Sequence, residues 1–191
     1  MSRTKLFLIL TAMMGSLPAA GDRLPSKPDP LRMTSSVSVA SPELHLSDDT
    51  TFTWLENGRE IHSDDRLKNT NIKEMIDTSI ESTLVSLGFE FIAPKDDARY
   101  QIAYTAALEI DLTDQDILSR FGLLPGYPAI HSNQSRFERG SLIIYLVDPQ
   151  RTVVWRCATQ AAVDFDAEKE SRQKRIARIV KDMLETLPRS R

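Results

Sequence analysis

Two carboxylates are the side chains with the clearest capacity for chemistry. Glu109 and Asp111 stand two residues apart in the alternating segment 100–112. Positions two apart on a β-strand project to one face, so a strand here would place both carboxylates side by side. Paired carboxylates can act as general acid and base when their surroundings separate their pKa values. However, no nucleophile or cofactor motif accompanies them, and the outward face of a strand is commonly polar. A hydrolase or small-ligand pocket around this pair, under the loop 113–139, is therefore the alternative hypothesis.

A single thiol is the other candidate for chemistry. One cysteine can form neither an internal disulfide nor a thiolate zinc site or an iron–sulfur cluster. Cys157 shares one face of a predicted strand with Trp155. A free cysteine in that position behaves as a small apolar residue, because a reactive thiol needs exposure and a positive setting. The three histidines lack metal-ligand spacing. We therefore expect no catalytic residue, cofactor or metal site.

A surface for a partner is the leading functional feature. The segment 113–139 is a long irregular loop rich in apolar side chains, and such loops are often functional. These side chains could equally fold back as a lid on the core. The basic first half of the last predicted helix could meet anionic headgroups or an envelope polyanion, although an ordinary solvated helix face explains it as well. The candidate partner surface consists of Phe121, Leu123, Leu124, Tyr127, Arg172 and Arg175.

The elements that must position these residues are readable from periodicity. Steps of three and four residues between apolar side chains predict helices over 72–87 and 167–187. Alternation and β-branched composition predict strands over 51–54, 89–92, 100–112, 142–147 and 152–165, with a turn at 148–151. The order β-α-β-β-β-β-α predicts an α+β fold. We expect a two-layer sandwich, with a mainly antiparallel sheet and two helices on one face.

The N-terminal part predicts export. Residues 1–20 combine two early basic residues with the apolar run 6–14 and small residues after it, which is the layout of a signal peptide. The run is too short to span a membrane, and no later segment is apolar for long enough. Residues 21–49 are rich in Pro and Ser and indicate a flexible linker, with at most a short extended stretch at 36–39. A single domain should then occupy residues 50–188.

The charge balance and the residue at position 16 argue against a nucleic-acid partner and against a lipid anchor. The 191 residues carry 24 Lys and Arg against 27 Asp and Glu, a formal net charge of −3. A nucleic-acid partner would require a basic protein, so we expect none. Residues 13–16 have the shape of a lipoprotein processing box, but Ser16 stands where the lipidated cysteine would be. We therefore expect no lipid anchor.

The order and spacing of several segments resemble a known family. Thr51-Phe52-Thr53-Trp54-Leu55, the stretch 76–89, the run 139–148 followed by Val154-Trp155-Arg156, and the C-terminal helix ending in Leu187-Pro188 are similar to envelope lipoproteins of domain of unknown function 4136 (DUF4136). The likeness covers roughly residues 50–188. The family typically has a cysteine where Ser16 stands and a glycine where Cys157 stands.

The resemblance implies no catalytic residues. It implies an exported protein, periplasmic or associated with the outer envelope. We therefore expect a non-catalytic binding or scaffolding domain whose partner is an envelope protein or another envelope component.

Overall fold

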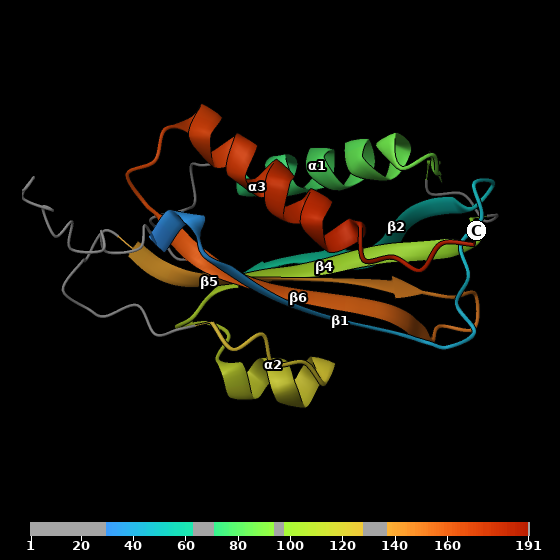
Figure 1. Cartoon of the computed structure of the whole chain (residues 1–191), viewed down its shortest axis with the longest axis horizontal. Helices are drawn as coiled ribbons and strands as arrows, with labels where there is room; N and C mark the ends of the chain where they lie inside the picture. The colour runs from blue at the N-terminus through green and yellow to red at the C-terminus, as the bar shows by residue number, and fades with distance from the viewer. Residues whose placement is uncertain (1–29, 63–70, 94–97, 128–136, 191) are drawn as a thin grey trace, which may run out of the picture.

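Six strands form one mixed sheet, in the order β1-β6-β5-β4-β2-β3 (Figure 1). The computed structural model describes residues 30–62, 71–93, 98–127 and 137–190, so the predicted signal peptide and the first part of the linker lie outside the described residues. The strands are β1 (Thr34–Ala40), β2 (Thr51–His62), β3 (Glu90–Phe91), β4 (Tyr100–Leu108), β5 (Phe137–Val147) and β6 (Val153–Asp164).

The sheet is mixed rather than mainly antiparallel. The pairs β1/β6, β6/β5 and β5/β4 are antiparallel, whereas β4/β2 and β2/β3 are parallel. Helix α1 (Ile72–Ser86) carries the chain back along the sheet between β2 and β3, and parallel neighbours need a crossover of this kind. The α+β class is confirmed, and the expected antiparallel arrangement holds only for the half of the sheet that contains β5 and β6.

The edge strand β1 is longer than the short extended stretch expected at 36–39. Composition assigns residues 34–40 to the linker, yet they pair with β6 from Thr34 opposite Ala161 to Ala40 opposite Trp155. The larger apolar side chains of this Ser-rich strand are Val37 and Val39, and Val39 is 43% exposed. Leu44 and Leu46, also within the predicted linker, are buried in the main core. The linker prediction is therefore wrong for this part, and the domain begins before residue 50.

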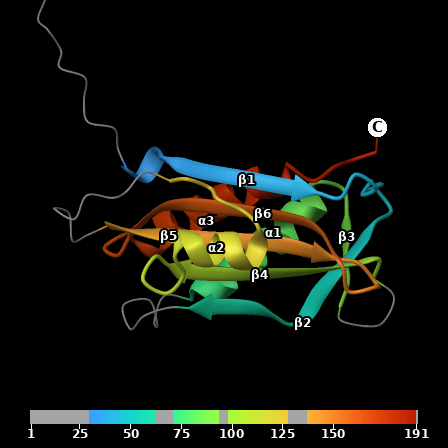
Figure 2. The ribbon, with the colours of Figure 1, turned by 90° about the horizontal axis from the view of Figure 1, so that it is seen from below.

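Helices lie on both faces of the sheet. Helices α1 and α3 (Lys169–Leu184) lie side by side above it in Figure 1, and their apolar stripes join the main core. A short helix, α2 (Asp114–Phe121), covers the opposite face (Figure 2). The two helices on one face agree with the prediction, but α2 adds a third layer, so the two-layer description is incomplete. Within the described ranges, no helix combines the length and apolarity needed to cross a membrane.

The core under α1 and α3 tapers along the sheet. Strand register aligns side chains in rows that face the two helices. Near the C-terminal ends of the helices the rows are bulky, and near their N-terminal ends they contain small residues. In sequence along the sheet, the rows are Ile102-Leu146-Trp155, Tyr104-Ile144-Cys157, Ala106-Leu142-Thr159 and Leu108-Gly140-Ala161. This taper positions the site described next.

Candidate ligand-binding site

The two acids of the alternative pocket, Glu109 and Asp111, do not lie on a strand. Strand β4 ends at Leu108, and a turn follows in which the backbone N–H of Asp111 donates to the carbonyl of Leu108. Glu109 forms an ion pair with Nη2 of Arg139, while Asp111 is exposed. The strand predicted from alternation, 100–112, therefore extends four residues beyond the observed end of β4. Glu109 acts as a counterion for a buried guanidinium, which is the ordinary requirement of a buried charge.

Arg139 fastens the loop that follows β4 to the sheet. Its Nη1 lies 3.1 Å from Oδ2 of Asp114 and donates to the carbonyl of Tyr127 at 3.3 Å. Gln160 of β6 completes the network, since its Nε2 donates to Oδ1 of Asp114 at 2.7 Å and its Oε1 accepts from the N–H of Tyr127. Both ends of the segment 114–127 are thus held against the sheet.

The apolar side chains of this loop form a lid on the second face. Leu123 and Ile117 are buried in a small core with Ile143 and Ala158 of the sheet. Phe121 packs against the ring of Tyr145 at a centroid distance of 6.3 Å. Among the loop residues of the candidate partner surface, Leu123 and Tyr127 are buried, and only Leu124 is exposed, at 52%. Of the two interpretations left open by the sequence, the described part of the loop adopts the lid. Residues 128–136 lie outside the described residues.

The two arginines of the candidate partner surface lie on the other side of the sheet. Nη2 of Arg172 donates to the carbonyl of Ala167 at 3.0 Å and to that of Phe165 at 3.4 Å. Nη1 of Arg175 donates to the carbonyl of Leu31, in the short helical turn Pro30–Arg32. Because α2 and α3 cover opposite faces, the six candidate residues do not form one surface (Figure 1).

Cys157 is a core residue, as predicted. Its side chain is fully buried on the α1–α3 side of β6. Burial raises the pKa of the thiol to about 11 from its ordinary 9.0. The thiolate, which is the nucleophilic form, is therefore scarce at neutral pH.

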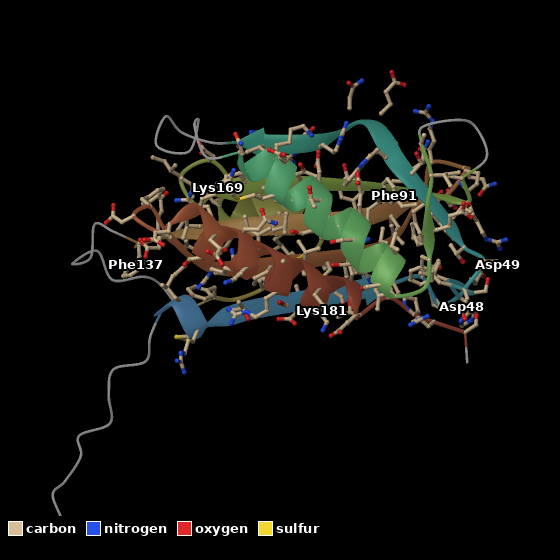
Figure 3. The ribbon with its side chains drawn as sticks, turned by 90° about the horizontal axis from the view of Figure 1, so that it is seen from above. Asp48, Asp49, Phe91, Phe137, Lys169 and Lys181 are labelled. Atoms are coloured by element: carbon tan, nitrogen blue, oxygen red, sulfur yellow. The ribbon has the colours of Figure 1, made fainter. Side chains whose placement is uncertain are left out.

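A cavity of about 580 Å³ lies between α1, α3 and the sheet, at the end of the sheet where α3 begins. In Figure 3, Lys169 and Phe137, the first residues of α3 and β5, mark this end, whereas Asp48 and Asp49 mark the opposite one. The apolar part of the wall comes from both helices and from four strands. It includes Leu31, Ile61, Ile72, Ile76, Ala106, Leu142, Ala161, Ile176 and Ile179.

Small residues in the sheet open this cavity. Ala106, Gly140 and Ala161 stand in the last rows beneath the helices, where bulky side chains would otherwise meet Ile72 and Ile176. Gly140 is required by close approach, since a Cβ there would lie 2.5 Å from Cγ2 of Val163. The helices thus contact bulky side chains at one end and span a hollow at the other.

The mouth of the cavity is basic. Among the described residues that line it, four are Lys or Arg, and one, Asp164, carries a carboxylate. Lys174 also pairs with Glu170 at 2.5 Å, and both side chains are exposed. The four cationic lining residues are Arg172, Lys174, Arg175 and Arg178.

Sequence reasoning missed this site because no motif marks it. It identified Arg172 and Arg175 as basic surface residues, but the apolar wall depends on which small residues face the helices. Neither Glu109 nor Asp111 lines the cavity. In the part of the chain that the structure describes, no group of three or more His, Cys, Asp or Glu residues is placed to hold a metal ion.

The family model of DUF4136, a domain of unknown function, matches residues 37–189. The chain belongs to the DUF4136 family. The match confirms the resemblance inferred from the segments after residue 50. It also begins within β1, in agreement with the inclusion of that strand in the domain.

Two solved structures are similar to this chain. A PelC variant from Paraburkholderia phytofirmans, described as a dodecamer, aligns with a TM-score of 0.50 and 11% identity over 83% of this chain and all of that one. A DUF4136 family protein from Bacteroides thetaiotaomicron aligns with a TM-score of 0.48 and 13% identity, covering 80% of this chain and 94% of the other. At 11% identity, the likeness to PelC concerns the fold alone. No curated protein matches the chain significantly.

Proposed function

We propose that this DUF4136 protein is a non-catalytic ligand-binding domain of the bacterial cell envelope, with the cavity between α1, α3 and the sheet as its ligand site. The observation that carries the proposal is the cavity itself. Its volume of about 580 Å³ falls within the range of about 300–1,000 Å³ typical of ligand pockets. Its wall is largely aliphatic, and most of its charged side chains come from α3. Apolar surface gives such pockets affinity, and a few polar groups orient the ligand.

The environments of the chemistry-bearing residues support a non-catalytic role. Glu109 is engaged with Arg139, and the thiol of Cys157 is buried and protonated at neutral pH.

The compartment is part of the proposal. The signal-like residues 1–20 support export to the periplasm or to the outer envelope, and Ser16 supports a chain without a lipid anchor. Cell fractionation of the full chain, with antibody detection, tests this directly. The proposed location requires the protein in the periplasmic or envelope fraction, and recovery with the cytoplasmic fraction would contradict it.

Titration with N-phenyl-1-naphthylamine, a neutral apolar fluorophore, tests the cavity. We expect saturable binding of one fluorophore per chain. Ala106→Phe, which places a ring in the cavity from the sheet, should weaken binding at least about tenfold, a loss of about 1.4 kcal/mol. Ile176→Trp should do the same from the helix side. Leu118→Phe enlarges an exposed side chain of α2 on the opposite face and serves as the matched control.

Two binding results would contradict the proposal. Circular dichroism establishes that each variant is folded. Absence of saturable binding by the unmodified chain, or equal binding by folded Ala106→Phe and Ile176→Trp, would reject the cavity as the ligand site.

A second candidate function is scaffolding through self-association. Strand β1 pairs with β6 on one side only, so among the described residues its other edge has no partner strand. Open edges can pair with another chain. The PelC structure with the same fold is described as a dodecamer. Light scattering coupled to size exclusion should then detect a concentration-dependent oligomer. A monomer at every concentration would count against scaffolding by self-association.

A further inference from the structure

We infer that the ligand of the cavity is an anionic amphiphile: one flexible aliphatic chain that enters the cavity, with a carboxylate or phosphate head at the first half of α3. This inference rests on the proposed function and specifies the ligand class of the same site. The size and lining of the cavity argue for the chain, and the charges at the mouth argue for the head.

The lining matches an aliphatic chain. The apolar part of the wall consists of Ile, Leu, Val and Ala side chains, and among the described lining residues the only ring is the imidazole of His62. An aromatic ligand would gain little stacking there. At roughly 30 Å³ for a water-sized group, the cavity has room for on the order of 15–20 non-hydrogen atoms. A medium-length acyl chain with a small head has that size.

The cations at the mouth match an anionic head. Arg172, Arg175 and Arg178 follow one another at steps of three residues, so they lie along one stripe of α3. Guanidinium groups bind carboxylate and phosphate in bidentate geometry. The whole chain carries a net charge of −3, so this cluster is a local excess rather than a general property.

The hydrogen bonds of the cluster leave capacity for a ligand. Nη2 of Arg172 donates to the carbonyls of Phe165 and Ala167, whereas its buried Nε has no partner among the described residues. Arg178 is exposed at the rim. The one lining carboxylate, Asp164, accepts from the backbone N–H of Asp166 at 3.0 Å. Among the described lining residues, four cations therefore accompany one carboxylate, and Glu170, outside the lining, pairs with Lys174.

Displacement of the neutral fluorophore from the full chain tests the inference. The competitors are dodecanoate, dodecyl phosphate and dodecan-1-ol, each below its critical micelle concentration. We expect the two anions to compete about tenfold better than the alcohol, because they add charge-assisted hydrogen bonds to the same chain. The stronger of the two anions distinguishes a fatty acid from a phosphate-headed lipid.

Substitutions of charged residues on α3 test where the anionic head of the ligand binds. The double variant Lys174→Gln/Arg178→Gln should reduce the preference for anions over the alcohol to about threefold or less, a ratio that does not depend on the affinity for the fluorophore. Lys181→Gln is the matched control, since Lys181 lies on the same helix outside the cavity and pairs with Glu185 at 3.7 Å. It should keep the full preference.

Failure of this inference differs from failure of the proposed function. If the fluorophore binds but all three competitors are equal, or if the double variant keeps the preference for anions, the amphiphile is rejected and the cavity remains. If Ala106→Phe binds phosphatidylglycerol vesicles as well as the unmodified chain does and neither binds dodecanoate, the basic stripe serves a membrane surface and the inference is wrong. If the fluorophore does not bind, the proposed function fails.

Discussion

The two ends of the layer between α1, α3 and the sheet have the same architecture and opposite packing. At one end Leu84 and Met183 of the helices meet Leu146, Trp155 and their neighbours in a filled core. At the other end the same helices lie above Ala106, Gly140 and Ala161 and leave a cavity. Strand pairing continues through both ends, so backbone hydrogen bonding does not distinguish them. Side-chain volume does: large residues stabilise the fold at one end, and small ones keep space at the other.

The largest expected effect comes from one leucine-to-alanine change made at each end. Leu146→Ala removes a fully buried side chain, and we expect it to lower the free energy of unfolding by about 2–5 kcal/mol. Leu142→Ala, on the same strand but at the cavity, should lower it by less than about 1 kcal/mol, because that side chain already borders empty space. Urea unfolding measures both. Equal losses would contradict the contrast between the ends.

Two adjacent leucines of the lid, Leu123 and Leu124, provide a second pair of substitutions to compare. Leu123→Ala should lower the free energy of unfolding by about 2–4 kcal/mol, because Leu123 is buried in the small core under α2. Leu124→Ala should change it by less than about 0.5 kcal/mol, because Leu124 is half exposed. Thermal and urea unfolding of the two variants would show whether the lid is a true part of the core. A stable Leu123→Ala variant would mean that it is not.

The thiol of Cys157 makes the filled end sensitive to alkaline pH. Its pKa is raised by burial to about 11, so the folded state resists ionisation that the unfolded chain undergoes near 9. The resulting stability is complete below pH 9 and is lost as pH rises to 11, by up to about 2–3 kcal/mol.

Unfolding free energies between pH 8 and 11 check this for the unmodified chain and for Cys157→Ala. The variant should lose less stability over this interval. Buried tyrosines with a raised pKa, such as Tyr104, contribute to the slope of both proteins and cancel in the comparison. Identical slopes would show that the thiol is not protected by the core.

The smallest expected effect is a gain in folding stability when the cavity is partly filled. Ala106→Leu adds apolar volume where the wall is empty, and such cavity filling commonly adds about 0.5–2 kcal/mol of stability. A rise in Tm with simultaneous loss of fluorophore binding would show stability and binding in opposition at one residue. A lower Tm would indicate that the space is already occupied.

The predicted elements were accurate where one local pattern determines them. The apolar stripe of α1 predicted residues 72–87, and the helix spans Ile72–Ser86. The turn at 148–151 forms between β5 and β6, with Oδ1 of Asp148 accepting from the N–H of Thr152 at 2.8 Å. Errors occurred where alternation had another cause. Leu112 continues the pattern of β4, yet it is buried beneath the lid after the strand has ended at Leu108.

The sequence by itself determined most local elements and the burial of Cys157, because each depends on residues close together in the chain. It also determined the family, through the order of several such segments. Tertiary structure decided the rest. It recruited the Ser- and Thr-rich residues 34–40 as an edge strand and paired Glu109 with Arg139. It also aligned Ala106, Gly140 and Ala161 beneath the helices. A small residue opens a cavity only when its neighbours in the same row are also small, and rows are set by the register between strands that are distant in sequence.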